Sequence, residues 1–241
     1  MGFLLLFTLG FVCWFFSTVA AGGAATILIP FIAFTLGVQM VAPIISVAAL
    51  VANPIRVYAF RKNINWQIIC YLLPGSIIGA ILGAWSFSKA NTQIIQIILG
   101  LFLISYILEN TLRKSAYTIR MKLSWFFPLG VIVSFLSGLI GATGPIQNPF
   151  MLNYGVTKEY LVGTKAINSL FMQITKITAY GFFGVFTTEA VIYGAVVGCG
   201  AMIGIFLARD YLKKINTEQF MQCTTTIMFL CGVAMLFKAL H

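Results

Sequence analysis

The chain has 241 residues, of which 60% are hydrophobic and only 8% are charged. Soluble domains carry about 25% charged residues, so this composition excludes an ordinary soluble enzyme and predicts a single all-α, polytopic membrane domain. The net charge of +10 has two explanations, which both stay open: loop cations on the cytoplasmic side and cations along an anion pathway.

Eight of the predicted elements are long apolar stretches. A spanning helix needs about 20 apolar residues, and such stretches run over 3–21, 40–60, 66–87, 92–109, 123–140, 160–182, 188–207 and 217–238. Two further stretches, 25–36 and 145–154, are too short to span upright, and each follows a glycine-rich break and contains a proline. We therefore expect eight long helices and two short, hairpin-like ones.

The two halves of the chain resemble each other. WFFSTVAAGGAATILIPF matches SFLSGLIGATGPIQNPF, which sets Pro30 opposite Pro149 and Gly22 opposite Gly141. GSIIGAILGA (75–84) resembles VVGCGAMIGI (196–205), so the offset stays near 120 residues. We predict two five-segment repeats, about 3–109 and 123–238, joined by a cytoplasmic linker at about 110–122.

The loop cations predict that these repeats are inverted. If each short segment returns the chain to its starting side, ten cations share one side, and the other side holds Lys89 and Lys238. The ten are Arg61, Lys62, Arg113, Lys114, Arg120, Lys122, Lys158, Arg209, Lys213 and Lys214. That bias follows the positive-inside rule and places both termini outside the cytoplasmic membrane. Without the reversal, the halves are parallel and the cations divide almost evenly.

The glycine breaks AAGGAA (20–25) and GATGP (141–145) are the first candidate sites. Each interrupts a helix inside the membrane, which is tolerated only where the backbone lines protein or a polar cavity. The helix after each break directs N–H groups toward it, and such an end favours an anion. The candidates are Gly22, Gly23, Ala24, Gly141, Thr143 and Gly144. Close packing of small residues is the alternative.

Buried cations and amides are the second group of candidates. Lys165 and Lys176 are 11 residues apart, close to three helical turns, and therefore share a face. The candidates on this stripe and in neighbouring segments are Asn53, Arg56, Asn148, Thr164, Lys165, Asn168, Gln173 and Lys176. Charged groups at membrane depth are functional candidates by default. The alternatives are snorkelling of the cations to the headgroups and helix packing by the amides.

Catalytic, metal and cofactor sites are not expected. The cysteines lie in apolar stretches without metal-ligand spacing, and the one histidine is His241. The five acidic residues fall at segment ends or in loops, which argues against a carboxylate proton relay and against a cation site. The expected partners are a small anion and the lipid bilayer, with a homodimer as a further candidate and no nucleic acid.

Three motifs resemble the sulfite exporter TauE/SafE family. They are AAGGAATILIPFIAFTLGV, PGSIIGAILGAW after a segment ending in RKNINW, and SGLIGATGPIQNPFMLNYGVTKEYLVGTKAI, which includes Gly163 and Thr164. The resemblance covers about residues 8–238. The first break has two adjacent glycines where many members have a longer run, and the second has Thr143 and Pro145 beside Gly144. These departures bear on which anion fits.

The resemblance implies transport of small, often sulfur-containing anions across the cytoplasmic membrane of a prokaryote. We expect a secondary transporter in which the anion rests between the two breaks and one repeat rocks against the other. A passive anion channel would use the same residues and stays open as an alternative. A membrane scaffold without transport activity is the third reading, and the shared polar stripe argues against it.

Overall fold

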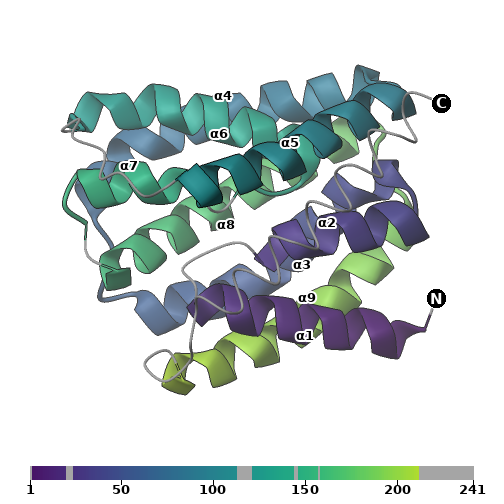
Figure 1. Cartoon of the computed structure of the whole chain (residues 1–241), viewed down its shortest axis with the longest axis horizontal. Coiled ribbons are helices and arrows are strands. Elements are labelled where there is room, and N and C mark those ends of the chain that lie inside the picture. The colour runs from purple at the N-terminus through teal and green to yellow at the C-terminus, as the bar shows by residue number, and fades with distance from the viewer. Residues whose placement is uncertain (1, 20–23, 113–120, 144–145, 157, 212–241) are drawn as a thin grey trace.

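The computed structural model describes residues 2–19, 24–112, 121–143, 146–156 and 158–211, and its regular structure within these ranges is helical (Figure 1). The first half forms α1 (Phe3–Val19), the short α2 (Ala24–Thr35), α3 (Val38–Phe60), α4 (Trp66–Lys89) and α5 (Thr92–Leu112). The second half begins with the 3₁₀ turn η1 (Leu123–Trp125) and continues through α6 (Phe126–Ile140), α7 (Gln147–Asn153), α8 (Lys158–Phe182) and α9 (Thr188–Tyr211).

The all-helical prediction is confirmed for the described residues. Each predicted segment up to 188–207 has its helix, including both short ones, and the two halves follow the same order of long, short, long and long helices. The predicted segment 217–238 and most of the linker lie outside the described residues. The full count of eight long and two short helices therefore stays a prediction.

Local sequence sets several helix ends. The Asn65 side chain accepts a hydrogen bond from Ile68 N at 3.2 Å and so caps the start of α4. Gly37 separates α2 from α3 with φ +94°, and Gly141 ends α6 with φ +90°. Glycine adopts positive φ without the steric cost that a Cβ brings. The chain can therefore turn sharply beside both short helices.

Among the residues that the structure describes, four helical stretches are long and apolar enough to cross a membrane: Val38–Phe60, Trp66–Lys89, Leu123–Ile140 and Thr188–Ala208. The 25-residue α8 is not among them. It is more polar than these four stretches, and its Asn168, Gln173 and Lys176 side chains are buried. Lipid cannot satisfy such groups, so α8 has to be shielded by its neighbours.

Glycines bring two pairs of helices into backbone contact. Figure 1 shows α4 beside α6 along one side of the molecule and α1 beside α9 along the opposite side, with α8 and α3 between them. A Cβ at Gly79 would lie 2.1 Å from the Val131 carbonyl oxygen, and one at Gly200 would lie 2.1 Å from that of Phe7. Small residues permit this closeness in membrane helix pairs.

The two glycine-packed pairs match each other. Gly75 and Gly79 meet Phe127 and Val131, while Gly200 and Gly204 meet Phe7 and Phe11. Phe127 lies 120 residues after Phe7, as the repeat predicts, but Gly200 lies 125 residues after Gly75. The contacts therefore correct the predicted pairing of 75–84 with 196–205 by about one helical turn. Glycines spaced four residues apart satisfy both registers, so sequence comparison alone could not separate them.

The contact pairs also fix helix directions. Gly194 and Gly198 of α9 meet Val47 and Val51 of α3, and Gly200 and Gly204 meet Phe7 and Phe11 of α1, so α1, α3 and α9 run in the same direction. The α4–α6 contacts, Gly75 with Phe127 and Gly83 with Phe135, likewise make those two helices parallel.

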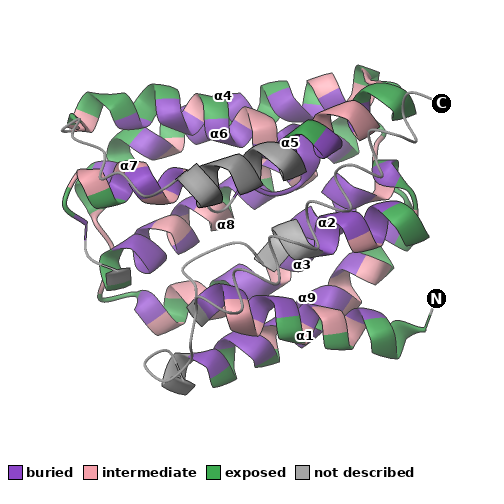
Figure 2. Cartoon of the chain, in the orientation of Figure 1, coloured by how far each residue is buried: buried purple, intermediate pink, exposed green. Residues whose placement is uncertain are grey.

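Helices α3 and α8 cross in opposite directions. Asn53 bonds Ser169, while Phe60, seven residues later, lies against Gly163, six residues earlier than Ser169. These two helices carry most of the described polar candidates, and residues 41–49 of α3 are all buried. In Figure 2, exposed residues concentrate on the outer faces of α4 and α1. The α3–α8 crossing is therefore the interior of the fold.

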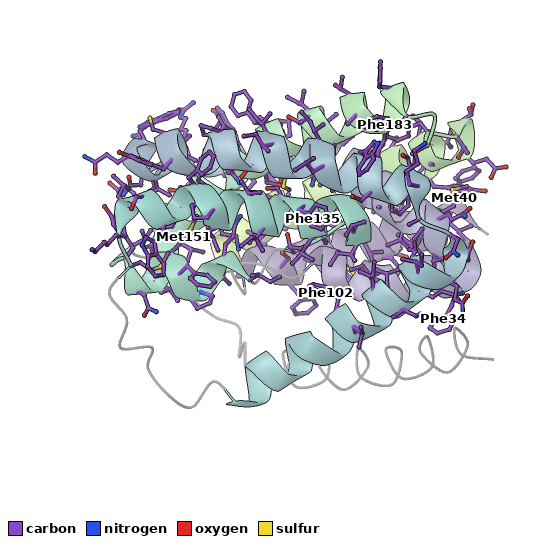
Figure 3. All side chains as sticks on the ribbon, turned by 90° about the horizontal axis from the view of Figure 1, so that it is seen from above. Phe34, Met40, Phe102, Phe135, Met151 and Phe183 are labelled. Carbon is purple, nitrogen blue, oxygen red and sulfur yellow. The ribbon has the colours of Figure 1, made fainter. Side chains whose placement is uncertain are left out.

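Two hydrophobic clusters hold the bundle. One draws residues from α1 to α6, α8 and α9 and includes Trp14, Ile44 and Val197. The other gathers Phe60, Met151 and their neighbours around the start of α4, α6 and α8. Figure 3 shows Met151 toward one end and Phe34, Met40 and Phe183 toward the opposite end. The polar residues of α3 and α8 lie along the crossing that these clusters flank.

Candidate functional site

The structure describes only some residues of the two glycine breaks. Gly22, Gly23 and Gly144 lie outside the described residues, and Ala24 is the first residue of α2. Gly141 is buried at the end of α6, and its carbonyl oxygen accepts a hydrogen bond from Lys176. An anion site on the N–H groups of these breaks therefore stays a prediction.

The α3–α8 crossing brings two of the predicted amides near its centre. Asn53 is buried and donates to Ser169 Oγ at 2.8 Å. Gln173 stands 120 residues after Asn53, and its side chain is also buried. Neither Gln173 Oε1 nor Asn168 Oδ1 has a hydrogen-bond partner in the described part of the chain. An amide can present either its oxygen or its NH₂ group, so these side chains offer unused polar capacity to a ligand.

Arg56 is half-buried on the last turns of α3. One terminal nitrogen, Nη2, donates to Thr18 Oγ1 on α1 at 3.2 Å. Its Nε atom is buried and has no acceptor among the residues that the structure describes. A guanidinium carries five N–H donors in a planar fork suited to oxoanions. Arg56 therefore keeps donor capacity that the protein around it does not use.

Lys165 on α8 lies close enough to Arg56 for the two charges to interact. Its Nζ donates to Asn148 Oδ1 of α7 at 2.5 Å. Both Asn148 and Lys165 are half-buried. This arrangement brings three of the predicted residues together from three helices: Arg56, Asn148 and Lys165. We call these three residues the Arg56–Lys165 cluster.

Lys176 is fully buried at the other end of the same face of α8. Its Nζ donates to Ser137 Oγ and to Gly141 O, each at 3.2 Å. Eleven residues of helix separate it from Lys165, which corresponds to a rise of about 16 Å. The two lysines share a face, as predicted, but their ammonium groups contact different helices.

The two threonine candidates make contacts within the fold. Thr164 is fully buried, and its Oγ1 accepts a hydrogen bond from Asn65 N at 2.9 Å, which ties α8 to the start of α4. Thr143 Oγ1 donates to Val133 O at 3.1 Å, which holds the end of the break against α6. Both hydroxyls are thus engaged in positioning the backbone, and a role in binding substrate stays a prediction.

Sequence reasoning missed Thr18, Ser137 and Tyr180. Each contacts the cation face or a helix end: Thr18 bonds Arg56, Ser137 bonds Lys176, and the Tyr180 hydroxyl donates to Gly138 O. One signal was present, because Ser17–Thr18 stands 120 residues before Ser137–Gly138. Hydroxyl residues at matching positions of the two halves are therefore a sequence signal for partners of the buried cations.

The electrostatic surroundings are one-sided. Both acidic side chains that the structure describes, Glu159 and Glu189, are exposed. The described partners of Lys176 and Arg56 are neutral oxygens. No group of three His, Cys, Asp or Glu side chains gathers within the described residues. Within the described residues, the printed hydrogen bonds of Arg56 and Lys176 therefore involve no acidic side chain.

An open cavity borders this region at the Arg56–Lys165 end. It is lined by Asn65, Tyr154, Gly155, Val156 and Tyr160. Asn65 contacts Thr164, the neighbour of Lys165 in the chain. The cavity therefore lies at the end of the bundle where α8 begins, and none of its lining residues belongs to the Arg56–Lys165 cluster.

Comparison with known proteins gives one match. A family model described as Sulfite exporter TauE/SafE matches residues 6–235, nearly the whole chain. No curated protein and no solved structure matches the chain.

Proposed function

We propose that this chain, which belongs to the sulfite exporter TauE/SafE family, is a secondary transporter of a small sulfur-containing anion such as sulfite, a sulfonate or thiosulfate. The family makes the chain a membrane transport protein. The substrate class, the cytoplasmic membrane of a prokaryote and the mechanism are our proposal.

The observation that carries the proposal is the unused donor of Arg56 beside Lys165. A buried charge costs several kcal/mol unless it is paired and hydrogen-bonded. Arg56 Nε has no described acceptor, and Lys165 adds a second positive charge next to it. An oxoanion between them would supply the acceptor that Arg56 Nε lacks among the described residues.

The anion site that we propose is the Arg56–Lys165 cluster. Asn53 and Gln173 lie further along the crossing and would receive the anion as it moves between the two sides. The N–H groups at the two glycine breaks, from Gly22 to Ala24 and at Gly144, would complete the path. Lys176 lies too far along α8 to contact the same small anion while it holds Ser137 and Gly141.

We further propose that the repeats are inverted. Because α1 and α3 run in the same direction, the intervening α2 has to return the chain to its starting side. The opposite directions of α3 and α8, which are equivalent helices of the two repeats, are what an inverted pair requires. The helix directions also place residues 61–65, 122 and 158–164 at one end, which agrees with the positive-inside rule.

This topology predicts opposite labelling of two exposed positions. Single cysteines at Lys89 and Glu159, both exposed, in a background without the native cysteines, should react with a membrane-impermeant maleimide from opposite sides of the membrane. Residue 89 should be labelled in intact cells, whereas residue 159 should need permeabilised cells. If the short helices did not reverse the chain, both residues would lie on the same side, so equal labelling of both would reject the inverted arrangement.

The glycine contacts favour moving units that mix the two repeats. Helix α1 of repeat 1 is packed backbone to backbone on α9 of repeat 2, and α6 of repeat 2 is packed on α4 of repeat 1. Close-packed backbones resist sliding. We therefore propose that the α1–α3–α9 unit rocks against the α4–α6–α8 unit about the α3–α8 crossing, instead of one repeat rocking against the other.

Anion binding and counterflow test the proposed function. The melting temperature of the purified protein should rise by a few degrees with sulfite, thiosulfate or sulfoacetate, and rise less with chloride at equal ionic strength. Proteoliposomes loaded with the stabilising anion should accumulate labelled anion by counterflow, which a channel cannot do. No stabilisation by any of these anions, together with no flux, would reject the proposal.

A further inference from the structure

The C-terminal end of the broken helix α6 carries a side-chain cation. The last carbonyl groups of a helix have no partner within the helix and bear a partial negative charge. Lys176 Nζ donates to Gly141 O and to Ser137 Oγ, each at 3.2 Å. Tyr180, one turn further along α8, donates its hydroxyl to Gly138 O. Two buried side chains on one face of α8 thus satisfy this end of α6.

The first repeat has the same arrangement. Arg56 stands 120 residues before Lys176, at the equivalent position of α3. It bonds Thr18, which lies in the last turn of α1, the helix before the other break. In each repeat, therefore, the third helix carries a cation to the C-terminal end of the first helix. A chance contact would not be expected at both equivalent positions.

Broken helices in secondary transporters often hold their coupling ion at such an end, where backbone carbonyls and hydroxyl groups are its ligands. In this chain the carbonyl oxygen of Gly141 and the hydroxyl of Ser137 face an ammonium group instead. We infer that the Lys176 ammonium takes the place of a coupling metal cation at the end of α6. Lys176 is then a positioning residue that holds the break in shape and makes the protein independent of Na⁺.

This inference rests on the proposed function for its meaning, but the contact can be tested separately from transport. Lys176→Ala removes the ammonium and leaves a cavity beside two oxygen ligands. A small cation with its water can fill that cavity, whereas the side chain in Lys176→Met fills the space with apolar atoms. Lys89→Ala, at an exposed lysine, is the matched control.

The experiment measures melting temperatures of the purified variants in sodium, ammonium and choline chloride at equal ionic strength. We expect the wild-type protein and Lys89→Ala to melt at the same temperature in all three salts. Lys176→Ala should melt lower in choline and recover by about 3 °C or more in sodium or ammonium. Lys176→Met should melt lower in choline without recovering in the other salts.

Two results would overturn the inference. One is a higher melting temperature of the wild-type protein in sodium than in choline chloride. The other is a folded Lys176→Ala whose melting temperature is the same in sodium, ammonium and choline chloride. If Lys176→Ala does not fold, the wild-type comparison decides alone. If the salt responses appear as expected but no anion is transported, the proposed function fails and the cation assignment stands.

Discussion

Lys165→Met should lower the initial rate of anion uptake by proteoliposomes about 10- to 100-fold at sub-saturating anion. The proposed anion would lose one charge-assisted hydrogen bond, which contributes about 1.5–3 kcal/mol, and each 1.4 kcal/mol corresponds to about tenfold. Because Arg56 lies beside Lys165, the remaining site would keep a single positive charge, too weak to hold a dianion in a buried position. Lys165→Arg keeps the charge and should retain more flux than Lys165→Met.

The matched control is Lys89→Met, because Lys89 is exposed at the end of α4. The same change of side chain there should leave the uptake rate within twofold of the wild-type value. All variants are compared at equal reconstituted amounts and after the same size-exclusion step. This distinguishes a variant that misfolds from one that folds but binds the anion weakly. Normal uptake by Lys165→Met would remove Lys165 from the anion site.

Most helices were predictable because a long, apolar stretch of sequence is typical of a membrane helix. The short segments 25–36 and 145–154 appear as α2 and α7. They were recognisable because each follows a glycine-rich break and contains a proline. Segment 160–182 was recognised on length, although its polar residues keep it below the apolarity of a spanning helix.

The site was predictable as a set of residues but not as an arrangement. The spacing of Lys165 and Lys176 predicts a shared face, and α8 has one. Spacing within one helix says nothing about which neighbouring helix each ammonium meets, so the separation into Asn148 for Lys165 and Ser137 for Lys176 required the packing. Charge at depth identified the cations and polarity beside the break identified Asn148, whereas Thr18 and Ser137 had only their matching positions in the two halves as a signal.

Gly79→Ala should be among the most destabilising single substitutions in the described part of the chain. The new Cβ would lie 2.1 Å from the Val131 carbonyl oxygen and 2.9 Å from its Cα. These are backbone atoms of a packed helix, which cannot rotate away as a side chain can. Overpacking of this kind costs about 1–3 kcal/mol, so we expect a clear fall in the melting temperature in detergent.

Gly181→Ala is the control, because it makes the same glycine-to-alanine change in a helix without a steric clash. Nothing lies within 4 Å of the Cβ that it adds to α8. It should leave the melting temperature unchanged or raise it, because alanine favours helix by about 1 kcal/mol over glycine. Gly204→Ala, whose Cβ would lie 2.4 Å from Phe11 O, should repeat the Gly79 effect at the other glycine-packed pair. The two costs should add in the double variant, because the sites share no partner. If both single variants melt like Gly181→Ala, these contacts do not hold α1 to α9 or α4 to α6, and the mixed moving units lose their basis.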